Sequence, residues 1–103
     1  METIIYRFPG DLTVLEAGET KKCIVDLLAR GPCILALDMS NVNYMDSAGL
    51  GVLTAAAFRA REKGGEVLLH RPQPRVYAVL RTTRLDKVFE ILDTPPGEAP
   101  AEA

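Results

Sequence analysis

One stretch decides the fold of this chain: Leu35-Ala-Leu-Asp-Met-Ser-Asn-Val-Asn-Tyr-Met-Asp-Ser-Ala-Gly-Leu-Gly-Val-Leu-Thr-Ala-Ala-Ala57. Apolar residues lead into Asp38, a short polar loop follows, and a helical pattern begins at Ser47. The sequence therefore predicts a strand, a loop and a helix, with the hydroxyl of Ser47 at the helix start.

Similar units flank this stretch on both sides. Strands are predicted within 1–8, 33–37, 66–70 and 88–92, and helices over 13–30, 47–63 and 74–83. Thr13 and Glu16 form a capping-box pattern, while Gly31-Pro32 and Gly64-Gly65 end the first two helices. The run 33–37 lacks polar alternation, which is typical of a strand covered on both faces. The alternation of strands and helices predicts an α/β fold with a largely parallel sheet.

Composition limits the kinds of function. The 103 residues suit one domain, expected over 1–93, followed by a disordered tail of Pro, Gly, Ala and Glu over 94–103. A net charge of −2 without a basic block argues against nucleic acid and anionic membranes. No run is long and apolar enough to span a membrane, and the start lacks a secretory pattern, so we expect a cytoplasmic protein.

The sequence offers few ligands for a metal ion and few groups for catalysis. Cys23 and Cys33 are expected to be buried thiols in a reducing compartment, and His70 is the sole histidine, which argues against a metal site. Asp38 and Asp46 could in principle bind Mg²⁺, but capping their loop is the favoured interpretation. Together these observations predict no metal and no cofactor.

Three catalytic patterns fail around Ser47. A nucleophile elbow needs glycine two residues before the serine, where this chain has Met45, although a Ser47–His70 pair across the sheet edge stays open. The pair Gly49 and Gly51 lacks the third glycine of a dinucleotide site, and no phosphate-binding P-loop is present. We therefore expect no catalytic residue and no enzyme.

What remains is a hydroxyl at a helix start beside Asp46. Phosphorylation would add a charge of about −1.5 to −2, which free helix amides would stabilise and Asp46 would oppose. In a docked surface such a charge could abolish binding. The alternative, that Ser47 is the N-cap of the helix, is compatible with the same role.

The motif Leu37-Asp-Met-Ser-Asn-Val42, followed by Met45-Asp-Ser-Ala-Gly-Leu-Gly-Val-Leu53, closely resembles the signature of bacterial anti-sigma factor antagonists, which are STAS domains. Further matches are Gly10-Asp-Leu12, Gly64-Gly-Glu-Val67, Pro74 with Val76, and Leu85-Asp-Lys-Val-Phe89. The resemblance implies a STAS-type α/β fold: a central, mostly parallel sheet of four to five strands with helices mainly on one face. Two departures are Thr13, where an aspartate is common, and Arg84, where a glycine is usual.

The resemblance also implies a role in partner switching in transcription regulation. The unphosphorylated protein would bind an anti-sigma factor serine kinase and release the sigma factor. Phosphorylation of Ser47 would end binding, and a metal-dependent serine phosphatase would restore it. The partner-binding residues would be Asp11, Thr13, Met45, Asp46, Ser47, Ala48, Gly49 and Leu50. The alternative is a non-phosphorylated STAS scaffold or accessory subunit of a stress-signalling or lipid-transport complex.

Overall fold

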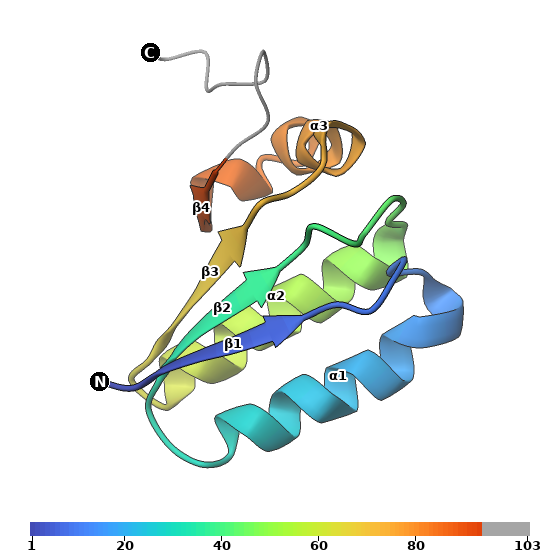
Figure 1. Cartoon of the computed structure of the whole chain (residues 1–103). Coiled ribbons are helices and arrows are strands. Elements are labelled where there is room, and N and C mark those ends of the chain that lie inside the picture. The colour runs from blue at the N-terminus through green and yellow to red at the C-terminus, as the bar shows by residue number, and fades with distance from the viewer. Residues whose placement is uncertain (94–103) are drawn as a thin grey trace.

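The computed structural model describes residues 1–93, so the expected tail lies outside the described residues. Figure 1 shows the elements, which in chain order are β1 (Thr3–Arg7), α1 (Val14–Leu28), β2 (Ile34–Asp38), α2 (Ser47–Glu62), β3 (Glu66–His70), α3 (Pro74–Thr82), the short 3-10 helix η1 (Leu85–Lys87) and β4 (Glu90–Leu92). The predicted elements are all present with small shifts at their ends.

The four strands form one sheet in the order β1-β2-β3-β4, and every neighbouring pair is parallel. In Figure 1, α2 passes behind the sheet, α1 lies below β1 on its free side, and α3 crosses near the upper end of the sheet. This arrangement confirms the α/β class and the expected placement of helices mainly on one face. Parallel pairing brings the carboxyl ends of all strands to one edge, where the loops after β1 and β2 meet.

The core lies between the sheet and its helices. Leu35 and Leu37 of β2 and Val67 and Leu69 of β3 are buried on the helix side. From α2 they are met by a buried apolar face rich in alanine, which includes Val52, Leu53, Ala56, Ala57 and Ala60. The alanines of this face allow α2 to lie close to the sheet.

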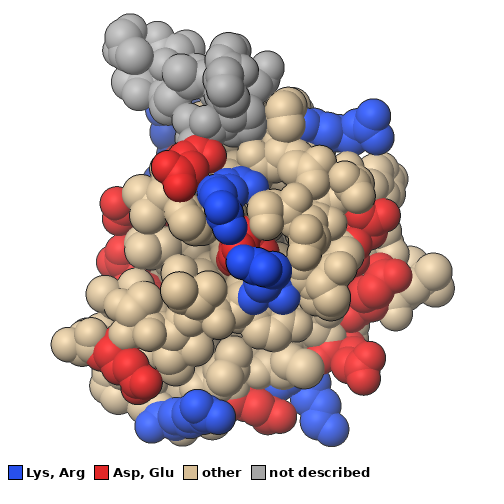
Figure 2. Space-filling view, in the orientation of Figure 1, with Lys and Arg blue, Asp and Glu red and all other residues tan. Residues whose placement is uncertain are grey.

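The opposite face of the sheet carries no helix in residues 1–93, so the expectation that 33–37 is covered on both faces is wrong. Ile5 on this face is 72% exposed, and Ile34, Ala36 and Leu68 are only half-buried. Figure 2 looks onto this open face, which is mostly uncharged, with basic side chains around an acidic one near its centre. A central strand is shielded by its neighbouring strands, and its composition does not reveal whether a further layer covers it.

The turns follow the local sequence signals. Thr13 and Glu16 form the predicted capping box of α1, and Gly31 and Gly64 take positive φ angles of 129° and 83° after α1 and α2. Arg84 also has a positive φ of 64°, at the position where the resemblance described above implies a glycine. A non-glycine residue in that region carries a conformational cost of about 1–2 kcal/mol.

Cys33 is buried as expected, but Cys23 is exposed, so the expectation of two buried thiols is wrong for Cys23. Its side chain lines a groove between α1 and β1 instead of entering the core. No helix within residues 1–93 has the length and apolar character that crossing a membrane requires.

Candidate functional site

The candidate site is built where the loops after β1 and β2 join. Leu12 and Met45 form an isolated parallel bridge: the Leu12 N–H donates to the Tyr44 carbonyl at 3.0 Å, and the Asp46 N–H donates to the Leu12 carbonyl at 3.3 Å. Asp11 adds to this link, because its Oδ1 accepts from the N–H groups of Asn43 and Tyr44 at 3.0 and 3.1 Å. The two loops therefore form one continuous surface.

Asp46 joins the starts of two helices. Its Oδ1 accepts from the N–H groups of Ala48 and Gly49 at 2.9 and 3.1 Å, and its Oδ2 accepts from the Val14 N–H of α1 at 3.1 Å. Burial alone would raise the pKa of Asp46, but the backbone N–H groups of Gly49, Val14 and Ala48 hold it below its usual value. Asp46 is therefore a carboxylate stabilised by backbone amides, and it carries its negative charge at neutral pH.

Ser47 is the first residue of α2 and is exposed. The N-cap is Asp46, so the alternative in which Ser47 caps the helix is wrong. Both residue types can cap, and the extended backbone of residue 46 (φ −108°, ψ −170°) decides between them. The Ser47 hydroxyl makes no hydrogen bond within residues 1–93.

The amides expected to be free for a phosphate are largely in use. Asp46 accepts from Ala48 and Gly49 through its side chain, and its carbonyl accepts from the Leu50 N–H at 3.0 Å. A negative group on Ser47 would thus meet the Asp46 carboxylate with little compensation from the helix start. This geometry opposes added negative charge more strongly than the sequence alone indicated.

The other predicted site residues divide into surface and interior. Asp11 is exposed, and Thr13, Ala48 and Leu50 are half-buried around Ser47. Met45 and Gly49 are buried. A Cβ at Gly49 would collide with the Leu12 carbonyl and the Met45 side chain, so these two residues shape the surface from beneath.

The sequence did not predict one apolar part of this surface. Val14, Leu15 and Tyr44 are 70%, 87% and 51% exposed, and all three lie on the segments that surround Ser47. The helical periodicity contained a signal for Leu15. It lies two and a half turns before the buried Ile24, so the two side chains lie on opposite sides of α1 and Leu15 points away from the core. We refer to Val14, Leu15, Tyr44 and Ser47 as the switch surface.

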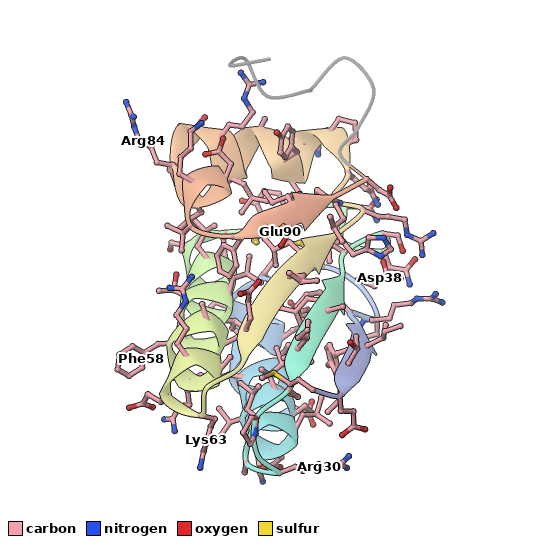
Figure 3. All side chains as sticks on the ribbon, turned by 90° about the vertical axis from the view of Figure 1, so that its left-hand side faces the viewer. Arg30, Asp38, Phe58, Lys63, Arg84 and Glu90 are labelled. Atoms are coloured by element: carbon pink, nitrogen blue, oxygen red, sulfur yellow. The ribbon has the colours of Figure 1, made fainter. Side chains whose placement is uncertain are left out.

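Asp38 holds the other end of the same loop. Its Oδ2 accepts from Arg7 Nε at 3.1 Å and Arg71 Nη2 at 2.9 Å, and its Oδ1 accepts from the Ser40 N–H at 3.0 Å. Although burial would raise the pKa of Asp38, Ser40, Arg71 and Arg7 hold it well below its usual range. Figure 3 shows Asp38 on the open side of the sheet, away from α2. Through Arg7 and Arg71, Asp38 links the end of β2 to the ends of β1 and β3.

The structure gives the metal and hydrolase alternatives no support. In residues 1–93 no three His, Cys, Asp or Glu side chains gather in a way that could hold a metal ion. The carboxylates of Asp38 and Asp46 are engaged as described above. His70 Nε2 lies 2.8 Å from Asp93 Oδ2, so its partner is that carboxylate and not Ser47.

Comparisons with known proteins agree with this fold and motif. The STAS domain family model matches residues 1–97. The "Anti-sigma-B factor antagonist" of Listeria monocytogenes is 28% identical over 82 residues, which cover 80% of this chain and 72% of that protein.

Two solved structures show the same arrangement. A Thermotoga maritima crystal structure, described as a "putative anti-sigma factor antagonist", has a TM-score of 0.83 and 31% identity, and the match covers 89% of this chain and 80% of that one. SpoIIAA, described as an anti-sigma factor antagonist in its unphosphorylated form, has a TM-score of 0.75 and 20% identity over 98% of this chain and 83% of that one, a likeness of fold alone. The chain belongs to the STAS domain family.

Proposed function

We propose that this protein is an anti-sigma factor antagonist that acts by partner switching and is itself not an enzyme. In its unphosphorylated form it binds an anti-sigma factor serine kinase in the cytoplasm, so that the sigma factor is released. Phosphorylation of Ser47 abolishes this binding, and a metal-dependent serine phosphatase restores it. The names of its relatives support the role, and one observation carries the switch: an exposed, unbonded serine hydroxyl directly beside the Asp46 carboxylate.

The switch surface supplies the proposed contact with the kinase. Exposed apolar side chains such as Leu15 and Tyr44 favour a protein partner, since they would be buried on docking. Asp11, Thr13, Ala48 and Leu50 complete the contact around Ser47, while Met45, Asp46 and Gly49 fix its shape. An unmodified Ser47 fits such a contact because its small hydroxyl needs little desolvation.

A phosphate on Ser47 would act through charge. It adds about −1.5 to −2 charges next to a carboxylate that already occupies the nearby amides. Burying this pair of like charges in an interface leaves both without adequate partners, and truncated or unpaired buried charges commonly cost about 2–5 kcal/mol. Such a loss converts a stable complex into free components without any change in the fold.

The test uses the full chain with its cognate kinase and ATP. Mass spectrometry is expected to find a single phosphate on Ser47, and Ser47→Glu is expected to lose kinase binding while Ser47→Ala retains it. Thr54→Glu is the matched control, because Thr54 is an exposed hydroxyl residue two turns further along the same side of α2. Equal binding by Ser47→Ala and Ser47→Glu would instead favour the non-phosphorylated scaffold or accessory subunit.

A further inference from the structure

The outer edge of β1 presents unpaired backbone groups. The Phe8 N–H donates to the Asp38 carbonyl and the Ile34 N–H donates to the Glu2 carbonyl, so the even-numbered residues of this segment face β2. In a parallel ladder the alternate residues point the other way, so the N–H and C=O groups of Thr3, Ile5 and Arg7 face outward. Within residues 1–93 no other strand pairs with this edge.

A groove runs beside this edge. It has a volume of about 460 Å³ and lies between β1 and α1, which Figure 1 shows beyond the free side of β1. Tyr6, Phe8 and Leu12 supply its apolar lining, and Glu16, Glu19 and Cys23 line it from α1. An edge strand bordered by a groove and a helix is the arrangement in which proteins add an extended peptide to a sheet.

The groove is acidic on its helix side. Glu19 is exposed and has no ion pair or hydrogen bond among the described residues. It lies near the Tyr6 hydroxyl, whose pKa is raised by burial and further by Cys23 and Glu19. Tyr6 packs edge-on against Phe8, with ring centroids 5.3 Å apart, which leaves the groove with aromatic surface beneath unpaired negative charge.

The negative charge of the groove distinguishes between three possible occupants: the segment 94–103, a second copy of the chain and a segment of another protein. The segment 94–103 contains Glu98 and Glu102 and no Lys or Arg, so it does not complement an acidic groove. Pairing of β1 with a second copy would bring the same acidic side of α1 from both copies together, including Glu16 and Glu19, and like charges oppose that contact. A basic segment of another protein has neither disadvantage.

We propose that β1 and the adjoining groove bind an extended segment of a partner protein in which Lys or Arg alternates with β-branched apolar residues. The segment pairs with the backbone of Thr3, Ile5 and Arg7. Its basic side chains point to the helix side, where their methylene groups pack on Tyr6 and Phe8 and their charges approach Glu19. Its apolar side chains lie beside Ile5 on the open face. This surface goes beyond the proposed switch and does not require Ser47.

The proposal is tested with a fluorescein-labelled peptide of three Arg-Val repeats and the full chain, by fluorescence anisotropy. We expect saturable binding that Glu19→Arg weakens by about tenfold or more. Glu62→Arg, the same charge change at an exposed site near the end of α2, is expected to leave affinity unchanged. N-methylation of alternate peptide residues, which removes the pairing N–H groups without altering the protein, is expected to abolish binding. Ser47→Glu is expected to bind the peptide normally, which separates this surface from the proposed switch.

Amide hydrogen exchange identifies the site directly. Peptide binding is expected to slow exchange at Thr3, Ile5 and Arg7 but not at Ile4 and Tyr6, which already face β2. Absence of binding at millimolar peptide, equal binding of a Glu-Val repeat, or equal effects of Glu19→Arg and Glu62→Arg would overturn the proposal. So would protection of this edge without peptide that disappears on dilution, since a second copy would then be the occupant. Tighter peptide binding after removal of 94–103 would assign the groove to that segment and likewise overturn it.

Discussion

Asp38 and Asp46 stand at the two ends of the same loop, yet their carboxylates are stabilised in different ways. Asp38 is buried and neutralised by the guanidinium groups of Arg7 and Arg71. Asp46 is partly exposed and is stabilised by backbone N–H groups alone. The cationic partners of Asp38 neutralise its negative charge, so a further negative charge nearby is tolerated. The backbone N–H groups around Asp46 are neutral, so its negative charge remains and repels another one. The first therefore suits a structural link, and the second suits a surface that responds to phosphorylation.

The largest loss of stability is expected at the Asp38 end of the loop. Asp38→Asn removes the partner of two guanidinium groups and weakens the anchor of Ser40, so we expect the free energy of unfolding to fall by about 3 kcal/mol. Arg7 and Arg71 are 61% and 47% exposed, and their partial rehydration keeps the loss at the lower end of the range for broken buried pairs. Urea denaturation measures it. A loss below about 1 kcal/mol would contradict the structural role of Asp38.

Acid should reproduce this loss in the unmodified protein. Because the folded pKa of Asp38 lies below its unfolded value near 3.9, the unfolded state binds the proton first as pH falls. Stability from this group is therefore complete above about pH 5 and is lost progressively below about pH 4. Urea midpoints measured from pH 6 to pH 2 should fall more steeply for the unmodified protein than for Asp38→Asn. Parallel curves would argue against the ion pairs.

Substitution of Gly49 tests the packing beneath the switch surface. In Gly49→Ala the new methyl group meets the Leu12 carbonyl and Met45, so we expect a loss of about 2 kcal/mol. Gly51→Ala is the matched control, because its added Cβ has open space around it and alanine favours a helix by about 0.5–1 kcal/mol over glycine. Thermal unfolding of both variants compares them. Stabilisation by both substitutions would show that the loops do not pack as described.

Asp46 should contribute less than Asp38. Asp46→Ala removes the N-cap of α2 and the link to the Val14 N–H, and such caps are worth about 1 kcal/mol. Asp26→Ala, an exposed acidic residue on α1, controls for loss of charge and should lie within about 0.5 kcal/mol of the unmodified protein. If Asp46→Ala cost as much as Asp38→Asn in urea denaturation, the proposed difference between the two ends would fail.

Local features of the fold could be predicted from the sequence. The capping box of Thr13 and Glu16 and the helix-ending Gly64 are signals within a few residues, and they describe the structure correctly. The motif around Asp46 also identified the family. These features succeed because their stabilising contacts lie close together in the chain.

Features that depend on distant segments could not be predicted. The two arginine partners of Asp38 lie 31 and 33 residues away, and nothing local to Arg7 or Arg71 indicates this pairing. The open face of the sheet was missed because β2 is apolar on both sides. The N-cap was ambiguous because Asp46 and Ser47 are both suitable residue types, and only the backbone conformation separates them.

We propose that Ser47 is a charge-sensitive position on a surface that otherwise stays intact. The most direct measurement is the affinity of the proposed anti-sigma factor serine kinase for the purified unphosphorylated and Ser47-phosphorylated forms, by calorimetry, with circular dichroism as the check on folding. Phosphorylation is expected to lower the affinity by at least about thirtyfold, which corresponds to about 2 kcal/mol, without changing the fold. Equal affinities of the two forms would contradict it.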